Sequence, residues 1–371
     1  MQQNTTFDIL IIGGGLGGLI AAIVLGKKYK VLLLEKDAYP RHRVCGEYIS
    51  NEVLPYLQSI GIDPIAQGAK KIDRFEISTH QGKLIKTALP LGGFGMSRYE
   101  LDNLLYKKAA EFAEIVIETC TQVDFKDNSF AITTKENLHY KATYVIGAFG
   151  KRSNVDKYLH RNFIQKKSPW LAVKAHYEHP FEDDVVALHN FKGGYCGLSK
   201  IENNAVNACY LTTYHSFKKV KSIAEFQQKV LSANPFLAKF FQNANPLFEE
   251  PLTISQISFE DKQPVENHIF MIGDAAGLIH PLCGNGMAMA IHSGKLLSEI
   301  FLQNDFNNRT ILEEKYTKIW SETFLKRLHT GRRVQGLLLQ PSLTKAFFNI
   351  SKMVPSLLPK IIAKTHGDIV I

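Results

Sequence analysis

Two short glycine motifs, about 260 residues apart, constrain the fold of this 371-residue chain more than any other feature. The apolar run Phe7–Ile12 leads directly into Gly13-Gly14-Gly15-Leu16-Gly17-Gly18, and the run Ile269–Ile272 leads directly into Gly273-Asp274-Ala275-Ala276-Gly277. Each pattern predicts a buried strand that ends in a turn able to contact a nucleotide. Either motif alone is a weak signal. Together, in this order and at this distance, they predict a site for FAD.

The first motif has the glycine spacing that a bound dinucleotide needs. The G-x-G-x-x-G positions are Gly13, Gly15 and Gly18. The first glycine allows a tight turn, the second lets the backbone approach a pyrophosphate, and the third lets helix and strand pack closely. A helix is expected over 19–27, with its positive end at the phosphates. The strand over 31–34 then ends at Glu35, where a ribose needs a hydrogen-bond acceptor.

The order of the expected elements indicates an α/β fold with a Rossmann-like FAD-binding domain in three layers. Residues 168–260 alternate polar and apolar side chains, which predicts an inserted, mostly antiparallel second sheet. After Asp274 the chain is expected to be helical to its end. The predicted segments are 1–70, 98–165 and 262–300 for the discontinuous FAD-binding domain, 71–97 and 166–261 for a substrate-binding sheet domain, and 301–371 for a C-terminal helical cap.

Cysteine usage and charge exclude several classes of protein. The five cysteines are scattered, odd in number and form no C-x-x-C pair, which argues for a reducing compartment and against a disulfide framework. A cytoplasmic location is therefore expected. Cysteine and histidine have no metal-site spacing, so no metal is predicted. The net charge of +9 is not accompanied by a nucleic-acid recognition motif, so no nucleic-acid partner is predicted.

The basic charge is concentrated near the end of the chain. Residues 326–371 contain eight Lys/Arg and one acid, Asp368, interleaved with leucine, isoleucine and phenylalanine. Basic, apolar helices of this kind can rest on an anionic membrane surface, which makes a peripheral membrane contact one interpretation. The alternative is a set of cap helices with a solvated basic face. The sequence predicts no oligomeric state.

The second motif has a chemistry that follows from its residue types. Asp274 offers a carboxylate to a polyol such as the ribityl chain of the flavin. A helix that starts at Gly286 or Met287 would aim its positive end at the flavin pyrimidine, where reduced flavin carries negative charge. Pro281 begins a segment whose glycines permit close approach of backbone N–H groups. The expected cofactor contacts on this side are Gly273, Asp274, Pro281, Gly284, Asn285, Gly286 and Met287.

Four segments, besides the first glycine turn, carry a resemblance to a known family. They are 39–47 with its Cys45-Gly46-Glu47 end, 97–102, 144–153, and 273–286. On these residues the chain resembles the FAD-dependent aromatic hydroxylase superfamily, and within it the branch that holds geranylgeranyl reductases. The likeness is spread over most of residues 7–300. It implies that Arg43 and Cys45 line the flavin site and that Arg98 contacts the cofactor.

The chain departs from the family pattern in two places that bear on its chemistry. Phe149 stands where the family has an aspartate linked to both FAD and NAD(P)H contacts. The electron donor is therefore expected to be NAD(P)H meeting the flavin transiently, or a separate reduced carrier. Gly197 stands where the reductase branch often has tryptophan, and a glycine there would enlarge the cavity over the flavin. The tryptophan block of flavin halogenases is missing, which argues against halogenation.

Three residues are candidates for catalysis. Cys45, Cys196 and Cys283 each lie in motif loops and are expected to converge on the flavin, with Cys45 the best placed for chemistry because the neighbouring Arg41 and Arg43 would favour its thiolate. Tyr195 and His280 are weaker acid/base candidates. The alternative is that these cysteines are small residues beside close backbone turns and that the tyrosine and histidine are structural.

These observations lead to three functional hypotheses. In the first, the chain is a monooxygenase that hydroxylates a lipophilic or phenolic small molecule through a flavin C4a-hydroperoxide, as the resemblance implies. In the second, it saturates prenyl double bonds like a geranylgeranyl reductase. In the third, it binds flavin without catalysing a reaction. The Cys45-Gly46-Glu47 loop favours the reductase, whereas Gly197 and the Cys283–Gly286 block favour an oxygenase with a bulkier substrate.

Overall fold

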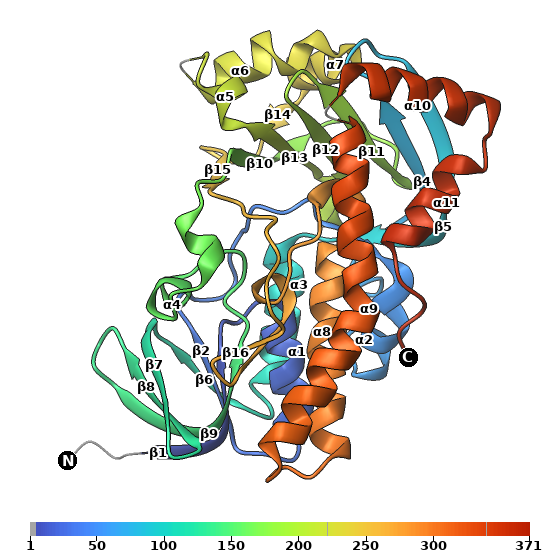
Figure 1. The fold of residues 1–371 in the computed structure, drawn as a ribbon. Coiled ribbons are helices and arrows are strands. Elements are labelled where there is room, and N and C mark those ends of the chain that lie inside the picture. Colours follow the sequence, from blue (N-terminus) through green and yellow to red (C-terminus); the bar gives the residue numbers. More distant parts are fainter. Residues whose placement is uncertain (1–4, 221, 339) are drawn as a thin grey trace.

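The computed structural model describes residues 5–220, 222–338 and 340–371. Residues 1–4, 221 and 339, which fall within the predicted segments, lie outside the described residues. The described chain builds two β-sheets. Figure 1 shows one sheet in the lower half of the view and the other in the upper half, with the long helix α9 (Arg309–Leu338) running beside both.

The first sheet is the predicted nucleotide-binding sheet. Its strand order is β16-β17-β9-β1-β2-β6, and the five strands from β17 to β6 pair in parallel. The strands are β1 (Thr5–Ile12), β2 (Val31–Glu35), β6 (Glu114–Ile117), β9 (His139–Gly147), β16 (Val265–Glu266) and β17 (Ile269–Met271), with the hairpin β7 (Cys120–Lys126) and β8 (Ser129–Thr134) attached to β9. Strands β1 and β2 read as apolar runs because both of their faces are covered.

Helices and the β7–β8 hairpin cover this sheet. Figure 1 shows α1 (Leu16–Leu25), α3 (Arg98–Ala109) and α8 (Gly286–Gln303) to one side of its strands and the hairpin to the other. Helix α1 begins at Leu16, three residues before the predicted start. The glycines inside it are needed for packing, because a Cβ on Gly17 would lie 2.9 Å from the carbonyl oxygen of Ala290 in α8.

The second sheet is mostly antiparallel, as predicted. Its order is β14-β10-β13-β12-β11-β4-β5-β3, and only the β4–β11 pair is parallel among the described strands. The strands are β3 (Tyr48–Ser50), β4 (Lys70–Ser78), β5 (Leu84–Gly95), β10 (Trp170–Glu178), β11 (Val185–Phe191), β12 (Gly194–Lys200), β13 (Val206–Thr213), β14 (Asn245–Pro246) and β15 (Leu252–Ser255). Strand β3 pairs with β5 in this sheet, although it lies within residues 1–70, which were assigned to the FAD-binding domain. The domain boundaries stay a prediction.

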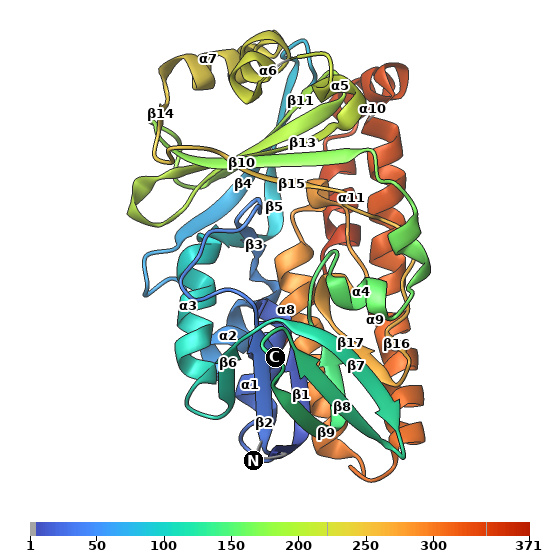
Figure 2. The ribbon, with the colours of Figure 1, turned by 90° about the vertical axis from the view of Figure 1, so that its left-hand side faces the viewer.

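One face of the second sheet carries a core of its own. Helices α5 (Tyr214–Phe217), α6 (Ile223–Lys229) and α7 (Pro235–Asn243) lie on the side away from the first sheet, as Figure 2 shows. Phe226, Leu237 and Phe240 pack there against Val173, Cys196 and Tyr210 of the strands. The other face of the sheet is left to line the space between the two sheets.

The end of the chain is helical, as predicted, up to its last residues. Helices α10 (Pro341–Met353) and α11 (Leu357–Thr365) follow α9, while the short helices α2 (Leu54–Ser59) and α4 (Asn154–Tyr158) lie earlier in the chain. After α11 the chain is extended and bonded to Glu52, whose carboxylate accepts from the N–H of Gly367 and whose carbonyl oxygen accepts from Val370 N at 2.7 Å. In the described chain, each helix is too short or too polar to cross a bilayer.

Candidate functional site

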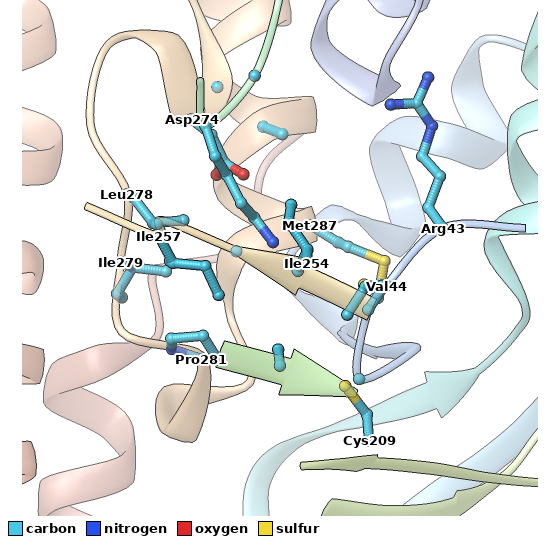
Figure 3. A pocket seen from close by; sticks show the side chains of 18 of the residues that line it. Arg43, Val44, Cys209, Ile254, Ile257, Asp274, Leu278, Ile279, Pro281 and Met287 are labelled. Carbon is cyan, nitrogen blue, oxygen red and sulfur yellow. The ribbon is translucent and has the colours of Figure 1, made fainter. Parts of the chain in front are cut away.

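One cavity of about 850 Å³ lies between the two sheets. Gly15 of the first motif and Asp274 of the second both line it, so the fold brings the two distant glycine loops to one place. Figure 3 shows Asp274 of the second motif and Arg43, from the loop after β2, around this space.

Two glycines of the first turn have different roles: Gly13 packs tightly against the backbone, and Gly15 leaves open space in front of α1. Gly13 has φ +106°, and a Cβ there would lie 2.5 Å from the carbonyl oxygen of Ala148. Gly15 has no atom within 4 Å of its Cβ position, and it caps α1 without a side-chain hydrogen bond. The free N–H groups of α1 therefore face an open cradle that suits an anion such as a pyrophosphate.

Glu35 ends β2 at the wall of the cavity, where the sequence predicted it. Its Oε2 accepts from the N–H of Gly14 at 2.7 Å and contacts Arg41 at 2.9 Å and Arg43 at 3.3 Å. These contacts fix the carboxylate beside the glycine turn, where it can accept from a ribose hydroxyl.

Arg98 begins α3 and lines the cavity together with Arg43. Its guanidinium makes two bonds to Asp102, at 2.6 and 2.8 Å, and Arg43 lies 3.4 Å from the same carboxylate. Asp102 is fully buried behind both. Two positively charged side chains are thus held in fixed orientations for a cofactor phosphate. Arg41 donates to the carbonyl oxygens of Asp37 and Ala38 and pairs with Glu35, while Arg43 pairs with Glu35 and Asp102. The structure therefore does not direct the two arginines at Cys45 as expected.

The second glycine motif is tied to the first through β9 and a buried lysine. Ile272 N donates to Gly147 O at 3.0 Å, and Ala148 N donates to Ile12 O at 2.8 Å. Lys262 donates from Nζ to the carbonyl oxygens of Asp274, at 2.7 Å, and Lys151, at 3.1 Å. Burial lowers the pKa of Lys262 to about 8. No motif around Lys262 predicts this role, because its two partners lie 12 and 111 residues away along the chain.

The segment after the second motif turns back to the cavity. Pro281, Gly284, Gly286 and Met287 all line it, and Gly284 adopts φ +64° at the turn. Helix α8 starts here without a side-chain hydrogen bond at its N-terminus. Its positive end therefore faces the cavity, as predicted for stabilising a reduced flavin.

Asn285 differs from the prediction. Its side chain is fully buried and does not line the cavity. The amide donates to Glu52 Oε2 at 3.3 Å and to Thr365 O at 3.0 Å, which anchors the start of α8 to the C-terminal region. Gly18 is also absent from the lining and serves packing, because its Cβ would lie 2.1 Å from Gly13 O.

The cysteines converge only in part. Cys45 and Cys283 line the cavity, but Cys196 lies on the opposite face of β12, in the core beneath α6 and α7. Cys209 of β13 lines the cavity instead, as Figure 3 also shows. Burial raises the pKa of Cys209 and of Cys283 to about 12, so both are neutral thiols. Strand alternation along β13 was the sequence signal that could have found Cys209.

Tyr195 and His280 have different positions relative to the cavity. Tyr195 lines it, and burial raises the pKa of its phenol well above the usual value, so the hydroxyl stays protonated. The ring of His280 is buried against Phe259, with centroids 4.3 Å apart, and it does not line the cavity. Burial lowers its pKa to about 3. The structure therefore does not bring His280 to the place that a catalytic acid or base would need.

Glu47, in the loop after Cys45, forms a buried charged cluster that the sequence did not predict. It lines the cavity with no exposed surface. Its two carboxylate oxygens contact Lys174 Nζ at 2.8 Å and His176 Nε2 at 2.7 Å, both from β10. Burial would raise the pKa of Glu47, but the Lys174 charge and the bond from His176 outweigh it, and the pKa is lowered. Glu47 is therefore a carboxylate that locks the loop onto the second sheet.

The half of the cavity away from the glycine turns is apolar, and we name it the apolar chamber. Its floor comes from strands of the second sheet and its roof from the last three helices. The floor includes Ile77, Leu89, Val186, Leu188 and Tyr195, and the roof includes Val334, Leu337, Phe347, Leu358, Ile361 and Ile362. Gly197 also faces this space, and the nearest atom to its Cβ position lies 3.7 Å away, which leaves room for substrate.

The residues at the polar end fit FAD. An open glycine cradle, fixed arginines, the Glu35 and Asp274 carboxylates and two uncapped helix starts correspond to its phosphates, ribose, ribityl chain and flavin ring. A family model described as "FAD binding domain" matches residues 6–303. The chain belongs to this family. It is an FAD-dependent oxidoreductase of the superfamily that contains flavin monooxygenases, halogenases and geranylgeranyl reductases.

Curated relatives resemble this oxidoreductase over most of their length. A digeranylgeranylglycerophospholipid reductase from Methanocaldococcus jannaschii is 24% identical over 359 residues, covering 91% of this chain and 88% of the relative. Conditioned medium factor receptor 1 from Dictyostelium discoideum is 23% identical, covering 87% of this chain and 69% of its own length.

Solved structures confirm the fold. The flavin-dependent brominase Bmp2 superimposes with a TM-score of 0.77 at 19% identity, covering 97% of this chain and 93% of that one. Pseudomonas aeruginosa PqsL in complex with 2-aminobenzoylacetate gives a TM-score of 0.74 at 16% identity, covering 93% of this chain and all of that one (100%). At these identities the likeness concerns the fold and leaves the reaction open.

Proposed function

We propose that this protein is an FAD-dependent monooxygenase that hydroxylates a lipophilic or phenolic small molecule. The observation that carries the proposal is the continuity of one cavity from the polar FAD end to the apolar chamber. A substrate with an extended apolar surface fits the chamber because the roof residues are aliphatic or aromatic. The substrate's reacting end would then meet the flavin near Cys45, Pro281 and Met287.

FAD would supply oxygen activation, and the chain's own residues would bind the cofactor, exclude water and position the substrate. Gly15, Glu35, Arg98 and Asp274 bind the cofactor, and the start of α8 stabilises negative charge on it. The roof of the chamber excludes water from the reacting atoms. Tyr195, kept protonated by burial, donates a hydrogen bond to a polar group of the substrate, while the thiol of Cys45 positions it. Reducing equivalents come from NAD(P)H or from a reduced carrier.

A second candidate is the reduction of prenyl double bonds. Similarity to the archaeal reductase over 91% of this chain and the Cys45-Gly46-Glu47 loop favour it. For this reaction FAD would supply the hydride and a nearby protein group would supply the proton, so two hydrogens would be added to the alkene and no oxygen would be consumed. The apolar chamber suits a prenyl chain as well as an alkylated phenol.

One pair of assays separates the two reactions. The FAD-loaded protein is reduced with dithionite and offered lipophilic phenols in air, with oxygen uptake and product mass recorded. In parallel, it is offered prenyl lipids without oxygen. A product with one added oxygen supports the monooxygenase. Oxygen-independent addition of two hydrogens refutes it in favour of the reductase, and bound FAD without turnover in either assay supports a flavin-binding protein without catalysis.

The chamber itself is tested by a polar substitution in its roof. Ile361→Gln places an amide against bound apolar substrate, so KM should rise about tenfold, while FAD affinity stays unchanged. Ile311→Gln, on the exposed side of α9 at 41% exposure, is the matched control and should leave KM as it is. Equal KM values for the two variants would place the substrate elsewhere.

A further inference from the structure

The outer surface of α10 carries an apolar stripe that the core does not use. Leu343, Ala346, Ile350 and Met353 follow one another at spacings of 3, 4 and 3 residues, so they share one helix face. Leu343 is 45% exposed, Ile350 51% and Met353 83%, and the next residue, Val354, is 46% exposed. We name these five residues the α10 stripe. Among the described residues, no other helix gathers as many exposed large apolar side chains.

The opposite face of the same helix is buried. Phe347 lines the apolar chamber. Phe348 is 1% exposed and packs in the same group of buried apolar side chains as Phe347. Helix α10 is therefore apolar on two sides, and only the inner side is explained by packing. In Figure 1, α10 and the turn that leads to α11 form an outer corner of the molecule. The α10 stripe is thus presented on a protruding part of the protein.

Unpaired positive charge lies on the same helix as the α10 stripe and on the helix that follows it. Lys345, Lys352, Lys360 and Lys364 are exposed, and none has a carboxylate partner in the part of the chain that the structure describes. Residues 326–367 contain no acidic residue that could neutralise them. The two paired arginines of this region, Arg327 and Arg332, lie on α9 and reach Glu52 and Asp261 instead.

This combination selects an anionic lipid surface over other occupants. A second copy of the chain docked face to face would bring the lysines of both copies together, which is unfavourable. Anionic phospholipid offers acyl chains to the stripe and phosphates to the lysines. With 13 residues, α10 is also too short to span a bilayer, and it suits a position in the interface plane.

We propose that α10 and the α10–α11 turn dock this protein on an anionic membrane, with Met353 and Val354 inserted between the lipid headgroups. The docking follows from the surface alone and goes beyond the oxidoreductase activity. One consequence rests on the proposed function: the roof of the apolar chamber would face the bilayer, so a lipophilic substrate could pass between them without crossing water.

Co-sedimentation with sucrose-loaded vesicles tests the docking on the FAD-loaded full chain. Vesicles of phosphatidylcholine with one quarter phosphatidylglycerol should retain the protein, pure phosphatidylcholine should retain little, and high salt should release it. Met353→Glu should weaken the retention at least tenfold. Lys352→Gln should weaken it about fivefold on the anionic vesicles and leave the weak binding to pure phosphatidylcholine unchanged.

Leu247→Glu is the matched control, because Leu247 is 54% exposed and directly follows β14, which Figure 2 shows on the opposite side of the second sheet from α10. It should bind the vesicles like the unchanged protein, and flavin absorbance should be equal in all variants. The proposal is overturned if the unchanged protein stays in the supernatant, or if Leu247→Glu loses as much binding as Met353→Glu. A dimer that Met353→Glu converts to monomer, with no vesicle binding, would assign the α10 stripe to a protein interface. Absence of turnover does not affect any of these outcomes.

Discussion

The two glycines of the first turn should respond in opposite ways to the same added methyl group. Gly13→Ala forces a Cβ onto a backbone with φ +106° and places it 2.5 Å from Ala148 O and 2.8 Å from Phe149 N. These are backbone atoms that cannot rotate away. Backbone strain alone costs about 1–3 kcal/mol, and the overlap adds to it, so the free energy of unfolding should fall by about 3 kcal/mol or more.

Gly15→Ala should leave the flavin-free protein intact. Gly15 has φ −80° and ψ −178°, which any residue adopts, and nothing lies within 4 Å of its Cβ position. The substitution should therefore be neutral, or stabilise by about 0.4–1 kcal/mol through the unfolded chain. The methyl group would occupy the space that a pyrophosphate approaches. FAD affinity should fall at least tenfold, about 1.4 kcal/mol.

Two measurements check this contrast. Urea unfolding of the flavin-free variants, followed by circular dichroism, gives the stabilities, and quenching of flavin fluorescence gives the affinities. Gly336→Ala serves as a control, because its Cβ position in α9 is also open but lies away from the glycine turns. If Gly15→Ala loses as much stability as Gly13→Ala, or binds FAD as tightly as Gly336→Ala does, the assignment of Gly15 to the phosphate cradle is wrong.

Two further substitutions probe the buried Glu47 carboxylate and the buried His280 ring. Glu47→Gln leaves the fully buried Lys174 without its carboxylate partner and should lower the free energy of unfolding by about 3–5 kcal/mol. Glu260→Gln is the control, because it breaks an exposed pair with Lys166 and should lower that free energy by less than about 1 kcal/mol. Equal losses in urea unfolding would contradict the role of the Glu47 cluster. Burial lowers the folded-state pKa of His280 to about 3, so only the unfolded chain binds a proton there below about pH 6.5, and stability falls as the pH drops. His280→Phe should remove about 1.5 kcal/mol of the stability loss between pH 6.5 and 5. Identical pH profiles for the two proteins would count against a buried neutral imidazole.

The elements with a local signal were predictable from the sequence. The glycine turns, Glu35 and the strands beside them follow from spacing and apolar runs within about 30 residues, because each was shaped by its own neighbours. The inserted antiparallel sheet followed from alternation in the same way. The start of α1 was placed three residues late because glycines score as helix breakers, while Gly17 is required there for packing against α8.

The parts that depend on long-range contacts could not be predicted. Lys174 and His176 contact Glu47 across 127 and 129 residues of the chain. No sequence pattern near Glu47 or near the two strand residues predicts this cluster. Asn285 was expected to face the cofactor, but its amide is held by Glu52 and Thr365 from the two ends of the chain. Cys196 and Cys209 lie on neighbouring strands and face opposite sides of the sheet. The glycine after Cys196 led to the prediction that Cys196 lines the cavity, but Cys209 does so instead.

Glu52 holds the C-terminal residues of the chain in place through its hydrogen bonds. Its buried carboxylate contacts Arg327 and Asn285 at 3.2 and 3.3 Å and also accepts from Gly367, so one side chain joins α9, the start of α8 and the residues after α11. Removing the last five residues would therefore leave the buried Glu52 side chain without the N–H of Gly367 from which it accepts. Shortened versions of this enzyme should be judged by their flavin content before any loss of turnover is ascribed to chemistry.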